Sequence, residues 1–214
     1  MREVLTTPKS FAGFVCRFLI LYLVFSPPWA GWDGIYGSFF RAFGTAVFVR
    51  QDDGGRELEF KTPGADSPRP LDTRIEIANR ALLHADGSGP VRDFDIDARA
   101  FAWDPMALFA ALVLATPIPM RRKLNALLIG TLCLNAIIMM GLAFCIWKES
   151  AEISLAAITP FWRPVVDAVS DFVITQTRLA LPPLIWILTT FRKEDWACSP
   201  ANKSRAVLAA AWKG

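Results

Sequence analysis

One uncharged apolar run, at residues 124–147, constrains the fold of this chain more than any other feature. It reads LNALLIGTLCLNAIIMMGLAFCIW and contains no acidic residue, no basic residue and no histidine. A helix needs roughly 20 apolar residues to cross the hydrocarbon core of a bilayer. Because lipid offers no partner to open backbone N–H and C=O groups, a run of this kind must be helical there. The run therefore predicts a transmembrane helix.

Three further apolar segments lie at residues 11–29, 101–120 and 172–191. The 214-residue chain is 53% hydrophobic and 20% charged, with a mean hydropathy of +0.34. Soluble domains carry about 25% charged residues, so the composition argues against a disordered chain and against a secreted disulfide scaffold. The four segments predict a polytopic α-helical membrane protein with four transmembrane helices.

The first segment also has features of a secretory signal peptide, since basic residues precede its apolar run. However, Arg17 interrupts the run, and no small-x-small cleavage site follows it. We therefore expect a helix that the mature protein retains.

Charge predicts the orientation of the four spans. Basic residues exceed acidic ones before the first span, in the turn RRK at 121–123 and after residue 191, whereas acidic residues exceed basic ones in segments 31–104 and 148–171. Basic segments stay on the cytoplasmic side. Both termini and the RRK turn are thus expected in the cytoplasm of a bacterium, with segment 31–104 outside its inner membrane. A net charge of +3 is too small to indicate a nucleic-acid partner.

Tryptophan supports the same orientation. Indole rings prefer the headgroup region of a bilayer, because one edge is apolar and the other donates a hydrogen bond. Five tryptophans fall at the expected outer ends of the spans and are predicted to be interfacial anchors: Trp29, Trp32, Trp103, Trp147 and Trp162.

The outer segment changes its hydrophobic period along its length. Residues 31–45 carry apolar groups at helical spacing, which predicts either a helix on the outer membrane surface or a continuation of the first span. Beyond them, apolar and polar residues alternate in four short runs around Val47 and Val49, Leu58 and Phe60, Ile75 and Ile77, and Phe94 and Ile96. Such runs predict four half-buried antiparallel strands, the first two joined by the hairpin signal DDGG at 52–55.

A four-strand sheet has one apolar face that needs a cover, for which the surface helix, the membrane and a partner protein are all candidates. The expected organisation is an N-terminal cytoplasmic end with the first span (1–30), an extracytoplasmic helix with a β domain (31–100), spans two to four (101–191) and a basic cytoplasmic tail (192–214). An outer amphipathic helix, interrupted at prolines 160 and 164, is expected within 148–171.

Polar and small residues in the spans are the candidate contact sites. Asn135 falls near the middle of the third span, where an amide is expected to bond another helix. Ala126 and Gly130 have the small-xxx-small spacing that allows two helices to approach closely. At the outer entry to the fourth span, Asp171 and Arg178 are expected to form a salt-bridged anchor or a partner site.

The sequence offers little for catalysis or for metal binding. Asp93, Asp95 and Asp97 alternate along one strand and faintly resemble a calcium loop, but Ala98 stands where such a loop needs glycine. The favoured interpretation is a solvated strand face that basic residues on neighbouring strands neutralise. A single histidine, His84, and four cysteines without CxxC spacing form no zinc, haem or iron–sulfur pattern. We therefore expect no cofactor and no enzymatic activity.

The order of these parts resembles a known family. Its marks are DPMALFAALVLATP at 104–117, which opens the second span, a short basic turn, a long span and a final LPPLIW at 181–186. This layout resembles the exosortase H-associated membrane proteins. The resemblance implies an accessory role beside a membrane transpeptidase that sorts proteins at the cell envelope. Such a transpeptidase uses Cys, Arg and His, a set that this chain lacks near the membrane.

Three classes of function follow from the sequence. The favoured one is a non-enzymatic scaffold of a larger envelope complex, whose partners are other integral membrane proteins and the lipid bilayer. The second is an accessory subunit of a respiratory or photosynthetic complex. The third, an intramembrane enzyme or transporter, is disfavoured because catalytic sets and deep carboxylates are missing.

Overall fold

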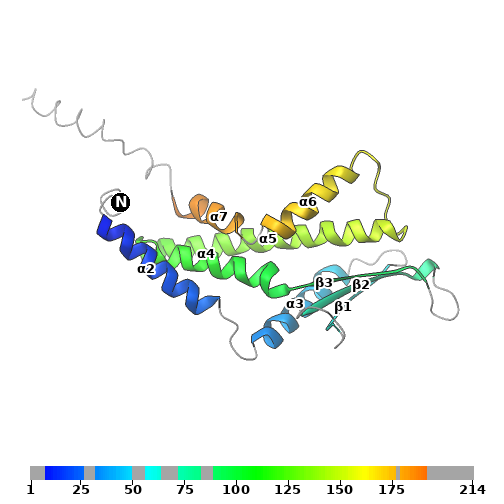
Figure 1. Cartoon of the computed structure of the whole chain (residues 1–214), viewed down its shortest axis with the longest axis horizontal. Helices are drawn as coiled ribbons and strands as arrows, with labels where there is room; N and C mark the ends of the chain where they lie inside the picture. Colours follow the sequence, from blue (N-terminus) through cyan, green and yellow to red (C-terminus); the bar gives the residue numbers. More distant parts are fainter. Residues whose placement is uncertain are drawn as a thin grey trace, which may run out of the picture.

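A computed structural model describes residues 8–26, 32–49, 56–63, 72–82, 89–176 and 179–191. One helix, α5 (Met120–Glu152), runs along most of the molecule (Figure 1). Three helices lie beside its N-terminal part: α2 (Pro8–Phe25), α4 (Asp104–Ala115) and α7 (Leu181–Thr190). A small sheet, α3 (Trp32–Phe48) and α6 (Arg163–Gln176) lie along its C-terminal part. The chain is thus a helical half and a mixed half joined by one helix.

The length of α5 exceeds what a bilayer requires. Its 33 residues extend over about 50 Å at 1.5 Å per residue, against a hydrocarbon core of about 30 Å. Among the described residues it is the one helix both long and apolar enough to cross a membrane. The span predicted at 124–147 is confirmed as helix, and the helix continues beyond it at both ends.

The second predicted span is shorter than expected. A π-helical turn, η3 (Arg99–Trp103), runs directly into α4, and the helical segment ends at Ala115 rather than at residue 120. The cause is the sequence TPIP at 116–119. Proline disfavours helical backbone at the residue before it, and Thr116 accordingly adopts an extended conformation with ψ 130°.

The fourth predicted span is wrong as a single helix. The segment 172–191 is divided between the end of α6 at Gln176 and the start of α7 at Leu181. Pro182 and Pro183 occupy the first turn of α7, where proline fits because its missing N–H would have no intrahelical partner. Further into a helix, the proline ring would clash with the preceding turn.

The sheet has three strands in the order β1 (Arg56–Lys61), β2 (Thr73–Asn79) and β3 (Val91–Ile96), all antiparallel. The prediction of a fourth strand around Val47 and Val49 is wrong, because α3 continues to Phe48. The hairpin predicted at 52–55 loses its first strand in this way, and its turn lies outside the described residues. Phe40, Gly44 and Phe48 follow one another at four-residue intervals, close to the 3.6-residue period of a helix, and so share one face of α3.

The apolar face of the sheet is covered by α3. Phe40 and Phe48 are buried, and the Phe48 ring stacks on Phe60 of β1 with centroids 6.3 Å apart. Gly44 makes this close approach possible, since a Cβ there would lie 2.6 Å from the Phe60 ring. Of the two interpretations of segment 31–45, the separate helix agrees with the structure. Of the three candidate covers for the sheet, the surface helix is the one found.

The C-terminal end of α5 forms the second support of the sheet. Arg92 of β3 bonds Glu152 at 2.6 Å, and the Asn79 amide donates to the Ile153 carbonyl at 3.2 Å. A short turn, η2 (Arg80–Leu82), follows β2.

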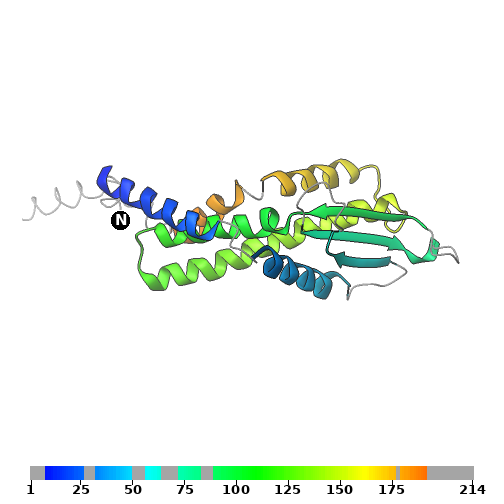
Figure 2. The same cartoon turned by 60° about the horizontal axis from the view of Figure 1, so that its bottom comes forward.

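The outer amphipathic helix predicted within 148–171 is two elements in the structure, because α5 continues to Glu152 and α6 begins only at Arg163. Figure 2 shows the sheet between α3 and α6, with β3 on the side of α6.

The apolar helices α4 and α5 meet at a glycine. Gly130 of α5 faces Phe109 of α4, and a Cβ at Gly130 would lie only 2.0 Å from the Phe109 ring. Phe109 is 1% exposed and belongs to a core that also includes Leu134 and Ile138 of α5. The glycine thus provides the space that a large aromatic ring occupies.

We predict that Gly130→Ala destabilises the folded chain by about 1–3 kcal/mol, as overpacking of a closed core does. The measurement is thermal unfolding in detergent, followed by circular dichroism. Ala136→Leu, an enlargement at an exposed position of the same helix, serves as the control and should change little. Adding Phe109→Leu to Gly130→Ala should recover part of the loss. Strictly additive effects of the two substitutions would contradict this contact.

Candidate functional site

The small-residue face of α5 is the first candidate contact site from the sequence. Ala126 and Gly130 are both buried, and they lie one helical turn apart on the side that packs against α4. In the structure this face is used within the chain, as a helix–helix contact. Other described residues thus cover these two small residues, which leaves them no exposed surface to present to a partner.

Asn135 lies on the same helix, one turn beyond Thr131. Its amide donates to the Thr131 carbonyl at 2.8 Å and to the Met106 sulfur of α4 at 3.6 Å. Thioether sulfur is a weak acceptor, so the main partner of the amide is its own helix. The geometry places Asn135 in the α4–α5 contact.

The tryptophans divide into several environments. Trp103 makes contacts within the protein: its indole N–H donates to the Phe25 carbonyl at 3.0 Å, and its ring packs against Tyr36. It thereby ties the end of α2 and the first turns of α3 to the start of α4. Trp147 is half-buried beside Phe144, whereas Trp162 is exposed and contacts Phe161 edge-on.

Four other sequence-predicted residues receive partial or no structural description. Trp32 begins α3 and Asp171 lies in α6, but the structure describes only their backbone. Trp29 and Arg178 lie outside the described residues. The salt-bridged anchor expected from Asp171 and Arg178 stays a prediction.

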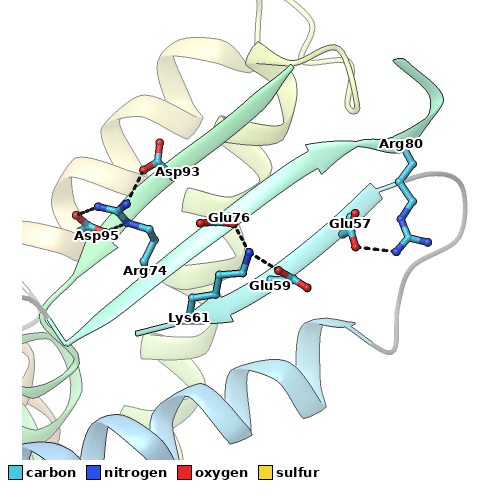
Figure 3. Close-up of polar contacts among 8 residues, drawn as sticks. All are labelled: Glu57, Glu59, Lys61, Arg74, Glu76, Arg80, Asp93 and Asp95. Carbon is cyan, nitrogen blue, oxygen red and sulfur yellow. Dashed lines mark hydrogen bonds and ion pairs between the residues drawn. The ribbon is translucent and has the colours of Figure 1, made fainter. Parts of the chain in front are cut away.

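The outward face of the sheet carries a line of ion pairs (Figure 3). Arg74 of β2 bonds both oxygens of Asp95, at 2.7 and 3.0 Å, and approaches Asp93 at 3.6 Å. A basic residue on the neighbouring strand thus neutralises the acidic alternation, as the favoured interpretation of the sequence expects. Asp97 differs, because β3 ends at Ile96 and the Asp97 carboxylate accepts the Ala100 N–H at 3.0 Å.

The remaining charges of this face are paired in the same way. Lys61 of β1 contacts Glu59 and Glu76, and Arg80 bonds Glu57 at 2.7 Å (Figure 3). The hydrogen bond from Arg80 lowers the pKa of Glu57, and the hydrogen bonds to Glu59 and Glu76 raise the pKa of Lys61. Each shift favours the charged form, so these two side chains stay ionised at neutral pH.

Within the described ranges, no group of three or more His, Cys, Asp or Glu side chains is arranged to hold a metal ion. Cys145 is buried, whereas Cys16 and Cys133 are exposed. His84 and Cys198 lie outside the described residues.

The sequence did not predict the contacts that Trp186 makes within the helical half. Trp186 of α7 donates to the Thr116 hydroxyl at 2.9 Å, and its ring stacks on Phe14 of α2 with centroids 6.0 Å apart. One side chain therefore links α2, α4 and α7. The available signal was a tryptophan inside the span predicted at 172–191, away from the expected interface.

Asp72 joins three elements that are distant in the sequence. Its carboxylate accepts the Ala98 N–H at 2.9 Å, while its carbonyl accepts a hydrogen bond from Arg41 of α3 at 2.5 Å. Burial raises the pKa of Asp72, and the nearby charge of Asp97 acts in the same direction. Desolvation by burial and the charge of Asp72 in turn raise the pKa of Tyr36.

We predict a pH-dependent cost at Asp72. A carboxyl whose pKa is raised in the folded state stays protonated to a higher pH when folded than when unfolded. Its contribution to the free energy of unfolding therefore falls as pH rises from the pKa of the unfolded state through that of the folded state. Asp72→Asn keeps the acceptor oxygen and removes the charge. The thermal midpoint of the variant, relative to that of the native chain, should therefore rise as pH increases from about 4, the ordinary aspartate range, towards 7. A difference between the two midpoints that stays constant across this pH range would contradict the assignment.

The comparisons with known proteins identify one family for this chain. A family model described as exosortase H-associated membrane protein matches residues 9–168, from the start of α2 into α6. The comparisons with curated proteins and with solved structures each found no match. The family model covers well over half of the chain and confirms the resemblance stated from the sequence. The chain therefore belongs to the exosortase H-associated membrane protein family.

Proposed function

We propose that this protein is a non-enzymatic, multi-pass accessory protein of the bacterial inner membrane, which scaffolds an exosortase-type sorting complex. The observation that carries the proposal is the continuous helix α5. It joins a helical half with an apolar surface to a half whose sheet presents ion pairs. A chain of this shape spans from lipid into water and offers contact surfaces in both.

The surface of the helical half supports a membrane location. Large apolar side chains on α2, α5 and α7 are exposed, and four leucines on these helices are 63–70% exposed: Leu23, Leu128, Leu132 and Leu188. Contiguous exposed apolar surface indicates contact with lipid or with other proteins. Neighbouring transmembrane helices and lipid are the surroundings that would remove this surface from water.

The proposed spans are α2, the segment η3–α4, the first part of α5, and the broken pair α6–α7. A helix break at membrane depth is tolerated where surrounding protein satisfies the freed backbone groups. Both α4 and α5 pack against α7, as that requirement demands. Together with the positive-inside rule, this arrangement gives cytoplasmic termini and an outer sheet domain.

Labelling of single cysteines tests the topology. The native cysteines Cys16, Cys133 and Cys145 are replaced by alanine, leaving Cys198 as one site, and Glu59→Cys in a chain without Cys198 provides the other. We expect a membrane-impermeant maleimide to label the thiol introduced by Glu59→Cys in intact spheroplasts, and to label Cys198 only after the membrane is opened. The reverse order would invert the topology. Equal labelling of both sites in intact spheroplasts would contradict a membrane between them.

Co-purification tests the scaffold role. An affinity-tagged chain, extracted from its own membrane in mild detergent, should bring down a colourless integral membrane protein of the exosortase type in a fixed ratio. Mass spectrometry and an absorption spectrum of the eluate give the readout. A tagged chain that emerges alone would contradict the role. Coloured redox or photosynthetic subunits would favour the second interpretation, which the family match does not support.

A further inference from the structure

Two basic side chains from different helices meet at the end of the helical half where α4 turns into α5. Lys123 of α5 is half-buried, and its ammonium donates to the Leu114 carbonyl, near the end of α4, at 2.6 Å. Arg17 of α2 is exposed, and it lies close enough for its positive charge to act on Lys123. Like charges repel, so an anion placed between these two side chains would stabilise the arrangement.

Contacts of neighbouring residues independently place Arg17 beside the end of α4. Phe14 of α2 stacks on Trp186, whose indole donates to the Thr116 hydroxyl. Arg17 lies three residues beyond Phe14, about 4.5 Å along the axis of α2. Leu114 precedes Thr116 by two residues, about 3 Å along α4. Because α2 and α4 pack together and the end of α2 contacts the start of α4 (Figure 2), the helices run antiparallel and both steps lead in the same direction.

No acidic side chain of the described helical half can neutralise these two cations. Residues 8–26, 105–148 and 179–191 contain no aspartate and no glutamate. The one acid of α2, α4 and α7 is Asp104, which begins α4 and therefore lies at its opposite end. A charged side chain at the edge of the hydrocarbon region is costly unless it reaches a polar partner. The missing negative charge must therefore come from another molecule or from another part of the chain.

The surroundings of the two cations favour one kind of anion. The side chain of Leu124, next to Lys123, is exposed, and so is that of Ile20, one turn beyond Arg17 on α2. A soluble anion gains nothing from such apolar neighbours, whereas the acyl chains of a phospholipid cover them. Arginine and lysine form charge-assisted hydrogen bonds with phosphate oxygens, and basic sites between transmembrane helices on the cytoplasmic side bind acidic headgroups.

We infer that Arg17 and Lys123 together bind the phosphate of one anionic phospholipid in the cytoplasmic leaflet. The planar guanidinium of Arg17 donates to two phosphate oxygens. The ammonium of Lys123 has three N–H donors, and one of them serves the Leu114 carbonyl. The lipid thus links α2 to the turn before α5. The inference rests on the proposed topology for the choice of leaflet, and it does not require the scaffold role.

The test uses the purified full chain in mild detergent and native mass spectrometry, which resolves each bound lipid by its mass. The probe is dioleoylphosphatidylglycerol. Its matched control is dioleoylphosphatidylcholine, which has the same acyl chains and a phosphate but no net charge. We expect one phosphatidylglycerol to bind at least tenfold more tightly than phosphatidylcholine. Equal binding of the two lipids would overturn the inference.

Single charge removals locate the site. Arg17→Gln and Lys123→Gln should each weaken the binding of phosphatidylglycerol at least tenfold. Arg121→Gln is the matched control, because Arg121 has the same charge but lies two residues before Lys123 and thus about 200° around α5; it should change binding less than twofold. Equal effects of the three substitutions would indicate diffuse attraction to a basic helix end and would overturn the inference. Arg17 is exposed, so Arg17→Gln keeps the test decisive even if Lys123→Gln disturbs the end of α4.

Inorganic phosphate separates a lipid site from a site for a soluble anion. Phosphate added at millimolar concentration should change the binding of phosphatidylglycerol less than twofold. Displacement of the lipid by phosphate would overturn the inference, by assigning the two cations to a soluble anion.

These outcomes are independent of the labelling and co-purification described above. A chain that labels as expected and retains its exosortase-type partner, but shows no preference for phosphatidylglycerol, would refute the lipid site alone. A chain that binds phosphatidylglycerol but purifies without such a partner would refute the scaffold role alone.

Discussion

The close contact between α4 and α5 is the interaction on which the rest of the structure depends. The Phe109 ring fills the notch that Gly130 leaves, and this fixes how the two helices lie against each other. Both other apolar helices are then placed by reference to this pair, since α2 packs on α4 and α7 packs on both. The far end of the same α5 supports the sheet through Glu152. One helix therefore contributes both the close contact with α4 and a contact with the sheet.

Sequence patterns predicted the elements whose signal is local. Unbroken hydropathy located α5, and strict alternation located β1, β2 and β3, because each pattern is complete within one element. The failures occur where two patterns compete. Val47 and Val49 alternate like a strand, but Phe40, Gly44 and Phe48 form a helical stripe whose partner, Phe60, lies in another element. The apolar segment 172–191 is similar, since hydropathy registers its composition but not the two prolines that start a new helix.

The candidate site was predictable only in part, for the same physical reason. Pairing of Asp93 and Asp95 with a base on the next strand follows from the regular geometry of a sheet, and Arg74 provides it. A cavity of about 510 Å³ beside β3 does not follow from any single segment. Its walls come from β3, η3, α5 and α6, and neither Glu149 nor Ser170 stands out in the sequence. Tertiary packing, rather than local pattern, brings these residues together.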